Sequence, residues 1–121
     1  MLLTKLVMMD ILRVVFYLFA VHALADFPLQ GDTTAINKNP NANTPLQKAV
    51  PWYYWLGSHA LIHGGGVALV TGSLLLGVLE TIAHFFIDWG KCQNYLSIHQ
   101  DQGLHILCKF VWVGILFGFL Q

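Results

Sequence analysis

Four long apolar stretches constrain this chain most, because stretches of this kind form helices that need an apolar solvent. They run from about Leu6 to Ala25, Leu56 to Val70, Leu74 to Ile87 and Leu104 to Leu120. Only 10% of the 121 residues are charged and 56% are hydrophobic, whereas a soluble domain is roughly 25% charged. We therefore expect an integral membrane protein that has the lipid bilayer as its partner.

The spacing of these stretches predicts an all-α fold, a transmembrane bundle in up-down topology within one domain of residues 1–121. About four helices are expected, over residues 5–26, 54–71, 74–90 and 98–120. The two middle stretches reach the ~20 residues of a membrane span only if their polar flanks are counted. Thr71-Gly72-Ser73 is the turn between them, and it leaves open a single long helix from Ser58 to Trp89.

A polar loop at residues 27–53 separates the first two predicted helices and contains all four prolines. Asp32 is expected to cap a short helix that runs through Lys38. The loop ends in an aromatic cluster, Trp52 to Trp55, which suits the headgroup layer of a membrane. Lysines on the loop side favour a cytoplasmic loop, and we expect the bacterial inner membrane as the location.

Charge and cysteine content exclude other classes of protein. The net charge is zero and the six basic residues are scattered, so a nucleic-acid partner is not expected. Cys92 and Cys108 form no C-x-x-C pair, so a metal site must use nitrogen and oxygen ligands. An alternative for the first residues is a signal peptide, since Ala23-Leu24-Ala25 follows an apolar run.

Five of the six histidines belong to pairs of metal-binding residues spaced four apart. Such a pair lies on one face of a helix, and each predicted helix has one. In an up-down bundle, all four pairs lie at the same end. Imidazole and carboxylate groups on facing helices suit zinc best, with manganese or iron as alternatives. The predicted ligands of this divalent metal are His22, Asp26, His59, His63, His84, Asp88, Asp101 and His105.

Further polar residues lie around these ligands. Glu80 and Lys109 each lie one turn deeper in the bundle and are expected to pair. We name Asp101, Asp88 and Glu80 as candidate catalytic acids or bases. The residues expected to bind an anionic substrate at the mouth of the site are Gln30, Lys38, Lys91 and Gln102. Gly64-Gly65-Gly66 is expected to permit close helix approach, and His99 is interpreted as a plain loop residue.

The motifs occur in a recognisable order: His22-Ala-Leu-Ala-Asp26-Phe-Pro-Leu-Gln30, His59 to His63, His84 to Lys91, and Asp101-Gln-Gly-Leu-His105. Together they resemble a family of small bacterial and phage integral membrane proteins with a domain of unknown function. The resemblance covers nearly the whole chain and implies no established reaction. More distantly, the layout is similar to that of membrane-bound metal-dependent hydrolases.

The leading hypothesis is a metal-dependent hydrolase at the membrane surface, acting on a phosphoester or an anionic lipid head group. Two alternatives remain open at the level of the sequence. One is a metal-binding or ion-translocating bundle, and the other is a structural bundle of a phage or bacterium, including a homo-oligomer. Haem is a weaker idea, because the carboxylates beside the histidines suit a harder ion.

Overall fold

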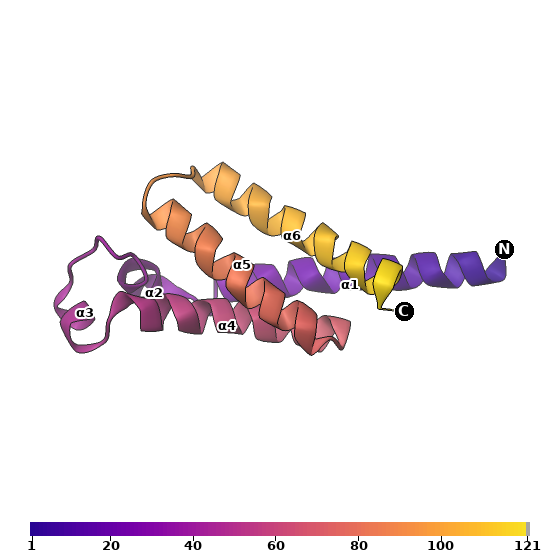
Figure 1. Ribbon diagram of the computed structural model, residues 1–121, viewed down its shortest axis with the longest axis horizontal. Helices are drawn as coiled ribbons and strands as arrows, with labels where there is room; N and C mark the ends of the chain where they lie inside the picture. The colour runs from indigo at the N-terminus through magenta and orange to yellow at the C-terminus, as the bar shows by residue number, and fades with distance from the viewer. Residues whose placement is uncertain (121) are drawn as a thin grey trace.

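The computed structural model describes residues 1–120 and has six helices and no strand within that range. The helices are α1 (Leu2–Asp26), α2 (Gly31–Asn37), α3 (Pro45–Ala49), α4 (Trp52–Thr71), α5 (Leu74–Cys92) and α6 (Ile98–Phe119). Four of them are long, and the short helices α2 and α3 lie at one end of the molecule (Figure 1). The predicted all-α class is confirmed, and the four predicted helices begin and end within three residues of the observed bounds.

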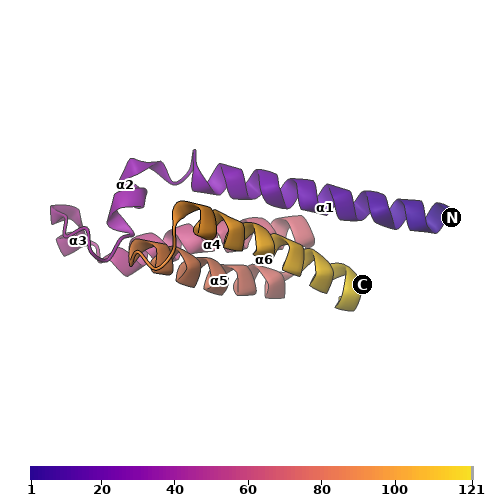
Figure 2. The same cartoon turned by 90° about the horizontal axis from the view of Figure 1, so that it is seen from above.

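The long helices alternate in direction. The connection from α1 to α4 and the turn from α5 to α6 lie at one end, and the turn from α4 to α5 lies towards the other (Figure 1, Figure 2). The end of α1, the start of α4, the end of α5 and the start of α6 therefore share one end. We call it the polar end, because the predicted metal ligands lie there.

The break between α4 and α5 is sharp. Gly72 ends α4 with a φ of 69°, a left-handed conformation that glycine adopts without strain. Ser73 then caps α5 through its hydroxyl, which accepts a hydrogen bond from the Leu76 amide. The single long helix left open by the sequence is therefore wrong, and α5 turns back along α4.

Glycines allow α4 to pack closely on two neighbours. A Cβ added to Gly64 would collide with Thr81 and the Gly77 carbonyl of α5, and one added to Gly66 would collide with Val21 of α1. Gly65 has open space around its α-carbon. The prediction of close approach is confirmed for Gly64 and Gly66, which face different helices.

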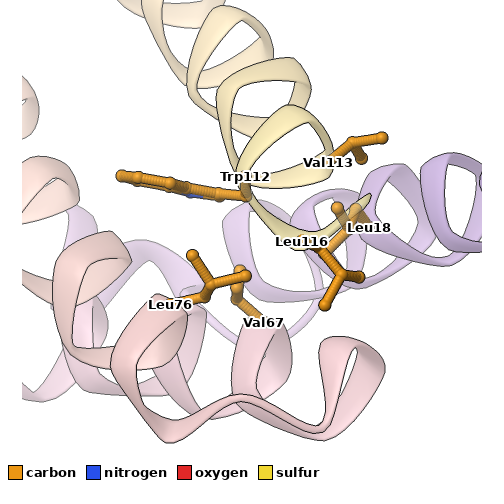
Figure 3. Close-up of a cluster of buried hydrophobic side chains, with 6 residues drawn as sticks. All are labelled: Leu18, Val67, Leu76, Trp112, Val113 and Leu116. Carbon is orange, nitrogen blue, oxygen red and sulfur yellow. The ribbon is translucent and has the colours of Figure 1, made fainter. Parts of the chain in front are cut away.

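The apolar core lies one to three helical turns from the ligands and draws on all four long helices (Figure 3). Its buried members are Leu18, Val67, Leu76, Trp112, Val113 and Leu116. Between this core and the polar end, Lys109 of α6 donates a hydrogen bond to Glu80 of α5. The predicted pairing of these two buried charges is confirmed.

The outside of the bundle is also apolar. Leu3, Phe16, Leu69 and Phe119 are each more than two thirds exposed. Helices α1 and α6 are long and apolar enough to cross a membrane, by length and composition. Such a surface on a protein with a buried polar cluster is the reverse of the usual soluble arrangement.

The polar loop contains more structure than its sequence indicated. Helix α2 forms where a short helix was expected, but Asp32 lies inside its first turn and Gln30 is the N-cap residue, so the predicted cap is wrong. Thr44 caps α3 and also donates a hydrogen bond to the buried Asn37 side chain. Gln47 donates to the carbonyls of Asn37 and Asn39. These bonds fold the loop back over the polar end.

Candidate metal centre

All eight predicted metal ligands come together at the polar end. They come in pairs from α1, α4, α5 and α6, and no side chain among them is more than 9% exposed. Burial of this much imidazole and carboxylate costs free energy unless the groups are paired or hold a metal. Their contacts therefore decide what the cluster can bind.

One group of potential ligands consists of Asp26 with His59, His63 and His84. The Nε2 atoms of His63, His59 and His84 lie 2.9, 3.3 and 4.0 Å from the same Asp26 oxygen, Oδ1. A zinc ion about 2.1 Å from each ligand atom would separate neighbouring ligand atoms by roughly 3.0–3.5 Å. The His63 and His59 distances are close to these values, and His84 would need to move closer by about 0.5 Å or more to join the same coordination sphere.

The imidazole nitrogens of this group also lack good alternative partners. Among the described residues, the Nε2 atoms of His59, His63 and His84 are buried and have no hydrogen-bond partner of good geometry. Buried polar atoms in folded proteins are nearly always satisfied, and exceptions call for an explanation such as an ion. Three converging nitrogens beside one carboxylate oxygen fit a divalent metal of the zinc type.

Asp88, Asp101 and His105 form a second group. His105 Nε2 lies 3.0 Å from Asp88 Oδ1 and 3.5 Å from Asp101 Oδ1. Asp88 also faces the first group, because its Oδ2 is 3.4 Å from His59 Nε2 and its Oδ1 is 3.5 Å from His84 Nε2. The two groups are thus continuous through Asp88.

His22 has a different position from the other four predicted histidine ligands. Its Nε2 atom lies 3.3 Å from Asp26 Oδ2 and 3.1 Å from the side-chain oxygen of Gln102. It belongs to none of the groups of converging ligand atoms among the described residues, which also include a third group of Glu80, His84 and His105. The geometry suits a residue that orients Asp26 from behind, and such outer contacts tune the affinity of metal sites.

Glu80 lies on the inner side of the histidines. Its carboxylate accepts hydrogen bonds from Lys109 and from the indole of Trp112, and its Oε1 is 3.5 Å from His84 Nδ1. A carboxylate behind a ligating histidine fixes the orientation of the ring. These contacts support a positioning role for Glu80 better than the predicted catalytic one.

The residues predicted to bind substrate line one cavity of about 100 Å³ at the mouth of the site. This cavity is called the polar cavity because most of its side chains are charged or amide groups. It is bounded by Asp26, Gln30, Lys38, Lys91, Asp101 and Gln102 together with the apolar Phe27 and Ile98. Lys38 donates hydrogen bonds to Asp88 and to the side chain of Gln30. Lys91 makes no salt bridge or side-chain hydrogen bond among the described residues.

Gln102 lines this cavity and also contacts three residues of the predicted ligand set. Its amide nitrogen donates to Asp26 Oδ2 at 2.9 Å and to Asp101 Oδ2 at 3.2 Å, while its oxygen faces His22. It therefore joins α1 to α6 across the site.

Asn37 was not singled out in the sequence, although it is buried beside Lys38 and its hydrogen bonds hold the loop that brings this lysine to the site. The only sequence signal was the density of turn-forming residues that follows it.

The buried cluster contains more negative than positive groups. With neutral imidazoles, the three carboxylates of Asp26, Asp88 and Asp101 face one ammonium group, that of Lys38. Glu80 and Lys109 neutralise each other. A divalent cation would offset these two negative charges when all imidazoles are neutral, and protonation of His105, which faces both Asp88 and Asp101, would leave one negative charge to offset.

His99 lies apart from the site, as expected, but in the exposed first turn of α6 and not in a loop. It serves below as a control. The end of α1 contacts residues of the other long helices through His22 and Asp26. These contacts hold the end of α1 against the other long helices.

No curated protein and no solved structure matches the chain. A family model does match, over residues 14–117, and its description is a protein of unknown function, DUF3307. The match begins within α1 and ends within α6, so it includes all eight predicted ligands and the polar cavity. The chain belongs to the DUF3307 family, whose domain has no established function.

Proposed function

We propose that this protein is a membrane-embedded, metal-dependent hydrolase whose site opens at one face of the bilayer. The observation that carries the proposal is the convergence on the Asp26 carboxylate of three buried Nε2 atoms, none of which has a hydrogen bond of good geometry among the described residues. If these residues hold a divalent ion, it would lower the pKa of a bound water to about 7 and would polarise an oxygen of the substrate.

Membrane insertion is the first part of the proposal. Helices α1 and α6 are candidate spans, and we propose that the hairpin of α4 and α5 inserts beside them. Its outward residues are apolar, as at Leu69 and Leu74, and its first turn contains the Trp52 to Trp55 aromatic cluster. Extraction with alkaline carbonate tests this: the protein is expected to stay in the membrane pellet.

The group of Asp26, His59, His63 and His84, called the zinc-type group, supports the second part of the proposal, which is metal binding. His59, His63, His84 and Asp26 supply the ligand set, with Asp88 between this group and Asp101. Glu80 and His22 orient His84 and Asp26 from outside. Catalytic zinc sites commonly use three protein ligands and one water, so with His59, His63, His84 and Asp26 all bound a water would occupy a fifth coordination position.

Asp101 is the best-placed general base. Its Oδ2 accepts from Gln102, but its buried Oδ1 has no hydrogen-bond partner of good geometry among the described residues. Asp88, the other candidate, is engaged by Lys38 and His105. Because Asp101 also lines the polar cavity, it can accept a proton from a water that enters with the substrate.

The arrangement supports ion transport less well. The interior beyond Glu80 and Lys109 is filled by the apolar core, and Asp10 and Arg13 pair on the exposed side of α1. A conduction path needs polar groups through the whole bilayer. We therefore place hydrolysis ahead of transport.

Elemental analysis of the detergent-purified protein tests the proposal. We expect stoichiometric zinc, manganese or iron in the wild type, loss of the metal in a His63→Ala/His84→Ala double variant, and retention in His99→Ala. Circular dichroism would establish that each variant keeps its helices. A folded wild type that holds no metal even after reloading would overturn the proposal.

A further inference from the structure

Two cavities of different character adjoin the metal ligands. One is the polar cavity, whose wall includes Asp26 and Asp101. The other is an apolar groove of about 280 Å³ between the loop and α4. The residues of the groove that matter here are Leu29, Val50, Tyr54, Trp55, His59 and Ile62.

The two cavities meet at the metal ligands. The turn after α1 contributes Gln30 to the polar cavity and Leu29 to the apolar groove. His59 lines the groove, and its Nε2 lies 3.3 Å from Oδ1 of Asp26, which lines the polar cavity. A molecule that reaches the metal from both sides must therefore be polar at one end and apolar at the other.

The polar cavity favours an anion. Lys91 has its whole ammonium group available, and Lys38 uses only two of its three hydrogens on Asp88 and Gln30. Lysine binds phosphate as a point charge. Asp26 and Asp101 would repel an anion, so an anion would occupy the cavity only if a bound cation offsets these carboxylates. At about 100 Å³, the cavity suits a bare phosphate group better than a large head group.

The groove favours a hydrocarbon chain. Leu29, Val50 and Ile62 give it apolar walls, and Tyr54 and Trp55 add aromatic faces. Trp55 donates its indole N–H to the Val50 carbonyl, so its ring is held in place and its polar atom is satisfied. Aromatic residues of this kind mark the membrane interface, where a lipid chain enters directly from the bilayer.

We propose that the substrate is a lipid phosphomonoester, a lipid whose head group is a terminal phosphate. The proposal rests on the proposed function, since it assigns the substrate of the same site. The phosphate lies between Lys38 and Lys91, the chain lies in the groove, and the ester bond lies beside His59 and Asp26. Water forms a new P–O bond as the bond to the lipid oxygen breaks. One proton of the water passes to the leaving lipid alcohol, with Asp101 as the carrier, and inorganic phosphate is released.

Binding to metal-loaded protein in detergent micelles tests this inference apart from turnover. The probes are dioleoyl phosphatidic acid, dioleoyl phosphatidylcholine, glycerol phosphate and inorganic phosphate. We expect phosphatidic acid to bind at least tenfold more tightly than the other three. Phosphatidylcholine lacks the free phosphate, and the two soluble probes lack the chain.

Two variants, each with a control, test the contributions of the two cavities separately. Ser58, an exposed residue of α4 on the groove wall, is replaced in Ser58→Trp to fill the groove. We expect a tenfold or greater loss of phosphatidic acid affinity with unchanged phosphate binding. Leu61→Trp is the matched control, because Leu61 is exposed on the same helix and outside the groove. Lys91→Gln is expected to weaken the binding of both phosphatidic acid and phosphate about tenfold. Lys48→Gln, which changes a lysine of α3 at another cavity, should leave both affinities unchanged.

The outcomes distinguish the two proposals. A protein that holds stoichiometric metal but binds glycerol phosphate as tightly as phosphatidic acid, or is unaffected by Ser58→Trp, overturns the lipid assignment and leaves the hydrolase. Equal binding of phosphatidylcholine and phosphatidic acid overturns it as well. A protein without metal overturns the hydrolase, and selection of phosphatidic acid that persists in such a protein would contradict the metal-dependent phosphate site.

Discussion

His63 Nε2 lies 2.9 Å from Asp26 Oδ1, the shortest approach of a histidine nitrogen to a carboxylate oxygen within the zinc-type group. The two residues come from α4 and α1, helices that the whole polar loop separates in sequence. Within residues 1–120, the other ion-pair contacts of Asp26 Oδ1 are with His59 and His84, which belong to the same group. Replacement of either residue should therefore lower metal affinity strongly while it disturbs the fold little.

His63→Ala and Asp26→Asn are therefore expected to lower metal affinity by more than about 100-fold, because the first removes a ligand atom and the second removes the negative charge of the carboxylate ligand. Competition with a chromogenic chelator measures this. The His99→Ala variant, whose side chain is exposed, should keep wild-type affinity. Wild-type affinity in both ligand variants would mean that the metal lies elsewhere.

Glu80→Gln tests the positioning of His84. The change removes the charge 3.5 Å from His84 Nδ1, and we expect metal affinity to fall about 10–100-fold. It also leaves Lys109 buried without its partner, at a cost of about 3–5 kcal/mol of stability. Chelator competition and thermal unfolding in detergent measure the two effects.

A double variant separates these effects of Glu80. In Glu80→Gln/Lys109→Met the unpaired charge is gone, so stability should largely return. Metal affinity should stay low, because His84 still lacks its carboxylate. Recovery of both properties together would assign Glu80 to stability alone and remove its role behind His84.

Much of the site could be predicted because it depends on local periodicity. Residues four apart share a helix face wherever the helix forms, so His59 with His63 and His84 with Asp88 were paired without knowledge of the fold. The shared end followed once four helices alternate in direction. The least certain part of the sequence prediction was the turn at Thr71-Gly72-Ser73. The left-handed conformation of Gly72, which the structure shows, establishes that α4 ends there.

Other parts of the site depend on tertiary paths that leave no periodic signal. Lys38 reaches Asp88 because the Asn37, Thr44 and Gln47 bonds fold the loop over the bundle. Gln102 joins Asp26 and Asp101 through an amide that no spacing rule distinguishes from an ordinary surface glutamine. Such contacts depend on how the helices pack against one another. From the sequence, Lys38 and Gln102 were expected only to line the mouth of the site.

Gly64→Val tests the packing that brings α4 and α5 together. The added side chain would collide with Thr81 and with the backbone of Gly77, and we expect a loss of about 1–3 kcal/mol. Gly65→Ala is the matched control, because open space surrounds that glycine and helix propensity favours alanine. Thermal unfolding in detergent compares them, and equal melting temperatures would argue against close packing at Gly64.

Asp101→Asn tests the general base. Asparagine is nearly the same size and keeps one oxygen, but it does not accept a proton at neutral pH. If Asp101 removes a proton from water, turnover of a phosphate ester should fall about 100- to 10,000-fold while stoichiometric metal remains. Helix α6 should be intact, since its start is held by the Ser97 and Gln100 capping box and not by Asp101.

Metal content decides between the two roles that the geometry gives to this residue. Asp101 Oδ1 is also 3.5 Å from His105 Nε2 within the second ligand group, so a ligand role predicts that metal is lost together with turnover. Asp88→Asn provides the comparison, because Asp88 lies between both groups and its replacement should release metal. An Asp101→Asn protein that keeps its metal and its full turnover would assign the proton transfer to another group.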